Sequence, residues 1–382
     1  MRQYAHLPRP MRHETSITGA ATDVGPPEVI AMRAISTNAV RCLLTLLLGL
    51  LGLGSGAGEG RAAGETRPPV AIQFSLDRPI DASAAPFVLA ASRGLFGSEG
   101  LAVNTNIASG SVDGIARVAA GTSDVALVDI NELIRFRDKP GTRPIKAVFV
   151  LFNKAPYAII ARKSRGIRAL SDIEGKTLGV PEGDLSIRLW PALARQNGIK
   201  TASVKQSRIS AAVREPMLSA GQVDAVTGFS YLSGVNLRDR GIPADDLAVL
   251  RYADYGCEAY GFALIVSPAF AAAKPEAVKG FLRAVMAGIH LTVKNPTRAA
   301  EEVVSRMDGG SRDLELERLH AVIRDNILTA DVRGNGIGGI DPIRFGRAVD
   351  QIAEDYKFQK RPDAADIFDD SFLPAPGDRV IN

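Results

Sequence analysis

The segment Ala120-Gly-Thr-Ser-Asp-Val-Ala126 returns one hundred residues later as Ala220-Gly-Gln-Val-Asp-Ala-Val226. In both copies a predicted helix ends at the glycine, where a left-handed backbone is favoured, and the aspartate then opens a predicted strand. This repeat predicts two similar structural units in one chain. We interpret Asp124 and Asp224 as structural residues at the two helix–strand junctions.

The elements around the repeat alternate between strands and helices. Val70–Leu76 alternates larger and smaller apolar residues and predicts a strand, and 86–95 then predicts a helix. Leu101–Ile107 predicts a second strand, and Leu178–Val180 predicts the first strand of the second copy. Strands separated by helices favour βαβ units and parallel sheets, so the fold class is α/β.

The chain is expected to leave the first lobe, build the second and return. The β-rich runs 145–152 and 157–162 carry it out, and 260–266 carries it back. A long helix that starts at Pro275, and helices near 313–329 and 343–357, then complete the first lobe. We expect lobe 1 at 68–162 and 260–382 and lobe 2 at 163–259, with a two-strand hinge and a ligand cleft.

The N-terminal segment is predicted to lie outside this fold. Residues 32–64 combine a basic start, the apolar run Cys42–Leu53 and an exit of small residues, which is typical of a secretory signal peptide. A retained membrane anchor is the alternative. Residues 1–31 are interpreted as an over-long translation start or a disordered segment. Cleavage would remove Cys42 and leave Cys257 without a disulfide partner.

Composition excludes several classes of function. The 382 residues include 46 Lys and Arg against 42 Asp and Glu, and 46% are hydrophobic, as expected of a globular chain. The basic residues are scattered, so no nucleic-acid partner is expected. Two cysteines and four histidines argue against a Cys/His metal site, and neither a metal nor a cofactor is predicted.

An ordered set of motifs resembles a known family. The motifs are Ala85-Pro86-Phe87, Gly94-Leu-Phe96, Glu99-Gly100-Leu101, the two repeat segments, Ser171-Asp172-Ile-Glu-Gly175-Lys176, Gly228-Phe-Ser-Tyr231 and Asp254-Tyr255-Gly256. In this order they resemble the substrate-binding proteins of ABC importers for nitrate, sulfonate and taurine, and the related NMT1/THI5-like group. The resemblance covers about residues 70–360.

This resemblance implies the fold of a type II periplasmic binding protein, which captures a small-molecule ligand between its lobes. It also implies an ABC permease and ATPase as partners, a periplasmic location and a monomer. Pyrimidine-binding members often carry a tryptophan near the end of the first strand, where this chain has Phe74. That difference argues against a thiamine precursor as the ligand.

Candidate ligand-binding residues in lobe 1 follow predicted strands, because parallel strands present ligand sites at their carboxyl ends. The first strand and its loop contribute Phe74 and Pro86. The loop Ser109, Gly110 and Ser111 opens a helix, where free amides suit an anion and either serine could instead cap the helix. Asp129 and Asn131 follow the next strand and could contact the ligand or cap the following helix.

Lobe 2 offers an equivalent set that is acidic. Its loop carries Glu182, Gly183, Asp184 and Ser186 where lobe 1 has neutral residues, which disfavours a bare anion and favours an amine or amide group. The remaining candidates are aromatic or lie near the return crossing, where packing is an equal alternative: Phe229, Tyr231, Tyr255 and Glu258.

The leading prediction is a binding protein without catalytic activity. The alternative is an enzyme on the same fold, similar to the THI5-like pyrimidine synthases or to desulfinase-like hydrolases. The synthases' cysteine-rich motif is missing here, and we therefore expect no enzyme. A periplasmic sensor subunit is a third possibility that the sequence does not separate from a transport subunit.

Overall fold

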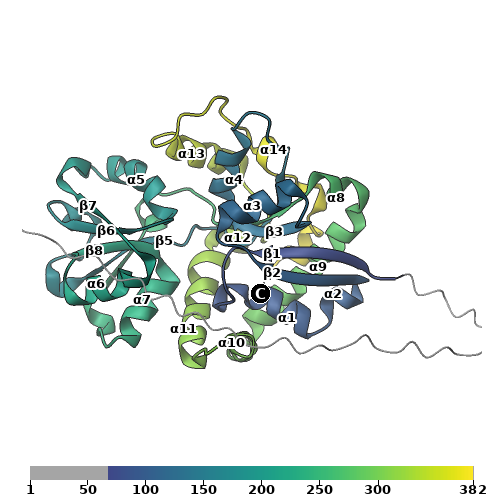
Figure 1. Cartoon of the computed structure of the whole chain (residues 1–382), viewed down its shortest axis with the longest axis horizontal. Coiled ribbons are helices and arrows are strands. Elements are labelled where there is room, and N and C mark those ends of the chain that lie inside the picture. The colour runs from purple at the N-terminus through teal and green to yellow at the C-terminus, as the bar shows by residue number, and fades with distance from the viewer. Residues whose placement is uncertain (1–67, 382) are drawn as a thin grey trace, which may run out of the picture. The chain divides into compact units, whose positions relative to one another are not determined.

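The computed structural model describes residues 68–381 of the chain (Figure 1). The predicted signal peptide at 32–64 and the segment 1–31 lie outside the described residues. Within the described part, no helix has both the length and the apolar character needed to cross a membrane.

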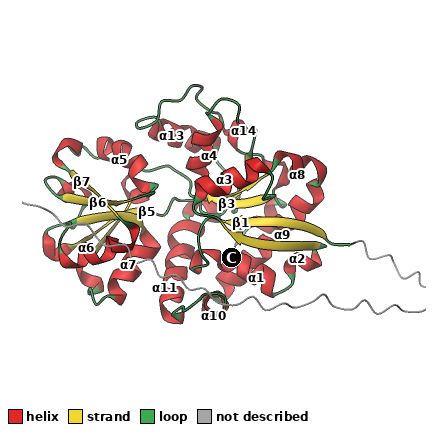
Figure 2. Cartoon of the chain, in the orientation of Figure 1, coloured by secondary structure: helices red, strands yellow, loops and turns green. Residues whose placement is uncertain are grey.

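Two five-stranded sheets repeat one plan, with helices around each (Figure 2). The first has the order β2 (Leu101–Ile107), β1 (Val70–Leu76), β3 (Val125–Asp129), β10 (Phe262–Val266) and β4 (Lys146–Val150). The second has the order β7 (Lys205–Ile209), β6 (Thr177–Pro181), β8 (Ala225–Phe229), β5 (Tyr157–Arg162) and β9 (Leu247–Arg251). We call each sheet with its covering helices a lobe, lobe 1 and lobe 2. The α/β class and the two-lobed architecture are confirmed.

Each sheet is mixed, whereas the sequence predicted parallel sheets. The first three strands of each order are parallel, but β10 is antiparallel to β3 and β4, and β5 is antiparallel to β8 and β9. These two strands bring the chain in from the other lobe and therefore enter their sheet from the opposite end.

The repeated aspartates have the same structural role in both lobes. Asp124 accepts a hydrogen bond from the backbone N–H of Gln73 at 2.8 Å. Asp224 accepts the equivalent bond from Thr177 at 2.7 Å. Each carboxylate thus ties the start of one strand to its parallel neighbour, and the predicted structural role is confirmed.

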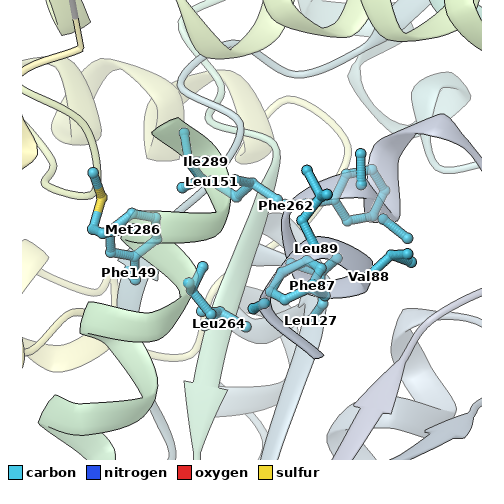
Figure 3. Close-up of a cluster of buried hydrophobic side chains, with 14 of the residues drawn as sticks. Phe87, Val88, Leu89, Leu127, Phe149, Leu151, Phe262, Leu264, Met286 and Ile289 are labelled. Atoms are coloured by element: carbon cyan, nitrogen blue, oxygen red, sulfur yellow. The ribbon is translucent and has the colours of Figure 1, made fainter. Parts of the chain in front are cut away.

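Helices cover both faces of the first sheet. Alternate residues of β3 enter two cores, with Val125 and Leu127 in one and Ala126 and Val128 in the other. Figure 3 shows part of the first core, where α1 (Ala85–Ser92) and α9 (Pro275–Lys294) lie on the sheet. The first helices of lobe 1 are α1 (Ala85–Ser92), α2 (Leu95–Ser98), α3 (Ser111–Ala120) and α4 (Ile130–Arg137), and α8 to α14 follow later in the chain.

The later helices complete lobe 1. Their bounds are α8 Pro268–Ala273, α9 Pro275–Lys294, α10 Pro296–Val304, α11 Arg312–Val322, α12 Ala330–Asn335, α13 Pro342–Ile352 and α14 Ala364–Ile367. The predicted start of the long helix at Pro275 is confirmed. Lobe 2 carries α5 (Trp190–Gln196), α6 (Arg214–Ala220) and α7 (Ser230–Asp239).

Two crossing segments join the lobes, 151–156 and 252–261. They are hydrogen-bonded to each other, because Gly261 N–H donates to Phe152 O at 2.9 Å and Ala155 N–H donates to Ala259 O at 3.2 Å. The first crossing comes earlier than the boundary expected after Arg162, since β5 pairs within the second sheet. The β-rich run at 157–162 therefore belongs to lobe 2.

Candidate functional site

A cavity of about 360 Å³ lies between the lobes at the carboxyl ends of their parallel strands. Loops that follow β1, β2, β6, β7 and β8 surround it, which is where open α/β sheets bind ligands. Its lining residues include Asp77, Arg78, Ser109, Gly110, Ser111, Val112, Glu182, Gly183, Asp184, Arg188, Arg214, Gly228, Phe229 and Leu232. We call this cavity the interlobe pocket.

Arg78 lines the pocket on the side of lobe 1. It donates to both carboxylate oxygens of Asp77, at 3.0 and 2.7 Å. Its guanidinium carbon lies 4.7 Å from the ring centroid of Phe229 and 4.4 Å from that of Phe262. Burial alone would lower the pKa of Arg78, but Asp77 and Tyr231 raise it above its usual value, so this arginine stays charged. Because Phe229 belongs to lobe 2, the cation–π contact joins the two lobes.

The start of α3 presents backbone amides at the pocket. Gly110 precedes the helix with φ of 102°, a conformation that disfavours a side chain, and no side chain caps the first turn. Ser111 donates to Asp77 at 3.0 Å and accepts from the Asp129 N–H at 2.9 Å. Ser109 instead bonds to Asp113. Neither serine caps α3, so backbone N–H groups in its first turn are free to donate hydrogen bonds to an acceptor group of a ligand.

The loop after β6 forms the opposite wall. Asp184 accepts bonds from the Ser186 N–H and hydroxyl, at 2.9 and 2.7 Å, and from the hydroxyl of Thr227. Both of its carboxylate oxygens are thereby used. Glu182 is exposed, and within residues 68–381 its carboxylate has neither an ion pair nor a hydrogen bond. Glu182 is thus the acid of this wall that is available to a ligand.

Every arginine of the pocket is paired with a carboxylate. Arg188 donates to both oxygens of Glu132 at 2.9 Å, across the two lobes. Arg214 pairs with Glu215 at 2.8 Å. A Cβ on Gly228 would come within 3.0 Å of the Arg214 guanidinium, so this glycine leaves room for the arginine at the end of β8. Five carboxylates thus lie in or beside the pocket with the three guanidinium groups. They belong to Asp77, Glu132, Glu182, Asp184 and Glu215.

The structure brings seven of the predicted candidates together around this pocket. They are Ser109, Gly110, Ser111, Glu182, Gly183, Asp184 and Phe229. All of them come directly after a predicted strand, so the rule that ligand loops follow strands located them.

Asp129 and Asn131 lie at the hinge instead, and both are buried. Asp129 accepts from the Asn131 N–H at 2.8 Å and caps α4, which was the alternative to ligand contact. The Tyr157 hydroxyl from the start of β5 also donates to it. The Asn131 side chain donates to Tyr260 O at 2.8 Å, on the second crossing segment. These two residues join lobe 1 to β5 of lobe 2 and to the second crossing segment.

The other candidates do not line the pocket themselves and have packing, hydrogen-bonding or ion-pair contacts instead. Phe74 is 0% exposed between Phe87 and Phe281, and Pro86 is buried in the first turn of α1. Tyr231 is 0% exposed and stacks on Phe229. Three further residues serve other contacts: Ser186 bonds to Asp184, Tyr255 packs on the second core and Glu258 pairs with Arg344 and Arg347.

Sequence reasoning missed the charged residues Asp77, Arg78, Arg188 and Arg214. Asp77 and Arg78 directly follow the strand 70–76, so the strand-end rule could have found them. Arg188 and Arg214 lie in or beside helices that follow the strands, and only the fold directs them at the cleft.

Comparison with known proteins agrees with the fold. The model of the family described as NMT1/THI5 like matches residues 81–299. The periplasmic aliphatic sulphonate binding protein SsuA of Escherichia coli superposes with a TM-score of 0.63 at 16% identity, over 80% of this chain and 94% of that one. At this identity the likeness shows the shared fold alone. The resemblance drawn from the motifs is confirmed.

Curated relatives are named both as binding proteins and as enzymes. The riboflavin-binding protein RibY of Chloroflexus aurantiacus is 30% identical over 56% of this chain and 60% of its own length. The 4-amino-5-hydroxymethyl-2-methylpyrimidine phosphate synthase of Legionella pneumophila is 30% identical over 41% of this chain and 49% of its own. The chain thus matches less than two thirds of these relatives' length.

The prediction that the chain is not an enzyme is contradicted by this finding. Relatives from Legionella pneumophila, Schizosaccharomyces pombe and Aspergillus parasiticus are all named as the same synthase. The missing cysteine-rich motif was therefore not a sufficient reason to exclude catalysis.

Proposed function

Because the chain belongs to the NMT1/THI5-like family, we propose that it is the solute-binding component of an ABC importer. It binds a small organic solute between its lobes in the periplasm and presents it to a permease and its ATPase. The observation that carries this proposal is the interlobe pocket, whose walls come from strand-end loops of both lobes. A ligand that contacts both lobes favours their closed arrangement, which the permease can then recognise.

The charges of the pocket point to the chemistry of the solute. Its three guanidinium groups are already neutralised by carboxylates, and Glu182 adds an acid whose carboxylate has no ion-pair or hydrogen-bond partner among residues 68–381. A simple anion would gain little from paired arginines and would be repelled by Glu182. The solute is therefore one with an ammonium or N–H donor for Glu182 and an acceptor group for the amides at the start of α3. Zwitterions and polar heterocycles meet this description.

The second candidate function is the synthesis of 4-amino-5-hydroxymethyl-2-methylpyrimidine phosphate. The observation that favours it is the shared name of three curated relatives. It is tested separately by expressing the chain in a strain that cannot make this pyrimidine and scoring growth without it.

Ligand binding is tested by thermal melting of the purified protein with taurine, ethanesulfonate, nitrate, riboflavin and the hydroxymethylpyrimidine. A ligand present at 100 times its Kd adds about 2.7 kcal/mol to the free energy of unfolding, which raises the Tm of a chain of this size by roughly 2 °C or more. A shift with taurine but not with ethanesulfonate, which lacks the ammonium group, supports the charge argument. The protein is also denatured and any released small molecule is identified by mass spectrometry.

Glu182→Gln should abolish most of the observed shift, because it removes the exposed carboxylate that is available to a ligand in the pocket. Glu301→Gln is the matched control, since Glu301 pairs with Arg312 on the surface of lobe 1. The proposal fails if no compound shifts the Tm and the denatured protein releases none. If nitrate or ethanesulfonate binds as well as taurine, Glu182 does not select for an ammonium group.

A further inference from the structure

Helix α13 contacts both lobes and both crossing segments. Its buried residues Phe345, Val349 and Ile352 belong to the same hydrophobic core as Trp190 and Leu193 of α5 in lobe 2. On the other side α13 packs on α14, which lies against β4 of the first sheet. The helix therefore spans the junction that must deform when the lobes move.

Arg344 joins α13 to both crossing segments at once. Its guanidinium donates to Asn153 O at 2.6 Å and Asn153 Oδ1 at 3.0 Å on the first segment. It donates to Glu258 O at 3.0 Å on the second segment and lies 4.0 Å from the ring centroid of Tyr260. The side chain is 7% exposed. A planar guanidinium group with five N–H donors can bond to two chain segments at once, whereas the ammonium group of a lysine lacks this fixed geometry.

Gln351, two turns later on α13, adds a second pair of bonds. Its Nε2 donates to Gly256 O at 2.7 Å, and its Oε1 accepts from the Glu258 N–H at 2.8 Å. Most of these contacts are to backbone atoms of the crossing segments. Rotation of the backbone in these segments, which hinge motion requires, would therefore break them.

The contact between α13 and the hinge is open on one side. A cavity of about 1090 Å³ lies beside it and is lined by Asn153, Glu258, Tyr260, Asp341 and Arg344. The bonds between Arg344 and the crossing segments therefore border a cavity, where water can replace them when the hinge moves.

We infer that α13 is a strap over the hinge and that Arg344 is the positioning residue that fixes the angle between the lobes. Arg344 does not touch a ligand in the interlobe pocket. It acts through the crossing segments and sets the population of the arrangement in which the pocket is narrow. Removing the hydrogen bonds of Arg344 to the crossing segments should let the lobes separate even without a ligand.

Trp190 provides the readout, because it is the only tryptophan of the chain, is 1% exposed and lies at the α13–α5 contact. In the ligand-free full chain, Arg344→Met should raise the constant for acrylamide quenching of Trp190 fluorescence several-fold. It should also increase the radius of gyration in small-angle X-ray scattering. Arg344→Lys should give an intermediate value.

Arg361→Met is the matched control. Arg361 binds the same helix, through Asp350 at 3.0 Å and Gly346 O at 2.9 Å, but it does not touch the hinge. It should leave quenching and scattering unchanged. A purely structural role of Arg344 would lower the Tm without changing either signal of the folded protein.

The inference is overturned if Arg344→Met is folded by circular dichroism and has wild-type quenching and scattering. If Arg344→Met does not fold, Gln351→Met decides in the same way, because it removes two hinge bonds and keeps the arginine. Neither measurement uses a ligand, so the outcome does not depend on the proposed transport function.

Discussion

Asp129 illustrates, for a single residue, how burial changes the role of a polar side chain. It follows a strand of the first sheet, as a ligand-binding aspartate would, but it is 0% exposed and bonded to Asn131 and Tyr157. Desolvation raises its pKa from 3.8 to about 7, against hydrogen bonds from Tyr157 and Asn131 that lower it. Glu132 nearby raises it further. Burial thus favours the protonated form of this carboxyl beside the hinge.

Replacing Asp129 with Asn should remove part of the pH dependence of stability. Since the folded-state pKa is raised, the folded chain binds this proton more tightly than the unfolded chain between pH 3.8 and about 7. The free energy of unfolding should therefore fall as pH rises through this window, by at most about 4 kcal/mol at 1.36 kcal/mol per pKa unit. Asp129→Asn should lack this decrease in urea titrations. Equal pH slopes for the two proteins would contradict the assignment.

Among the elements, α1 and α9 depend on a close backbone approach. A Cβ at Gly288 in α9 would lie 2.2 Å from Pro86 O in α1, so only glycine allows this distance. The two helices cover one face of the first sheet, and their packing fills the core drawn in Figure 3. Pro86 thus has a structural place in this contact.

Gly288→Ala should lower the free energy of unfolding by about 1–3 kcal/mol, because α9 must shift away from α1. Gly97→Ala is the control, since Gly97 in the short helix α2 has no atom within 4 Å of an added Cβ. The free energy of unfolding of that variant should be unchanged or rise by up to about 1 kcal/mol, because alanine has a higher helix propensity than glycine. Chemical denaturation of both variants makes the comparison, and similar values would rule out the close contact as the cause.

For the whole molecule, the cores do not follow the division into lobes. The second core combines Ile130 and Phe345 of lobe 1 with Trp190 and Leu250 of lobe 2. Tyr231 of lobe 2 belongs to the first core. The described residues 68–381 accordingly belong to one compact unit. The lobes therefore share apolar surface that neither could bury alone.

This sharing predicts that the lobes unfold together. Scanning calorimetry should give one transition with equal calorimetric and van't Hoff enthalpies. Trp190 fluorescence, which reports on the contact between the lobes, should change at the same Tm as far-UV circular dichroism. Two separate transitions would show that the shared core contributes little to stability.

The sequence by itself determined the repeated α/β plan, the two crossings between the lobes, the start of α9 and the roles of Asp124 and Asp224. These features depend on periodicity, capping residues and repeats, which are local in the chain. It also located the strand-end loops Ser109–Ser111 and Glu182–Asp184, because parallel strands place such loops at one edge.

Only the tertiary structure decided which of the candidates face the pocket. Phe74 and Tyr231 lie in cores, Asp129 holds the hinge and Arg214 reaches the pocket from a helix, since burial and direction depend on partners distant in sequence. The pairing of Arg188 with Glu132 across the lobes, and the bonds from Arg344 to both crossing segments, join residues 56 to 191 positions apart. No local pattern encodes such contacts, because they form only when the two lobes and the C-terminal helices pack together.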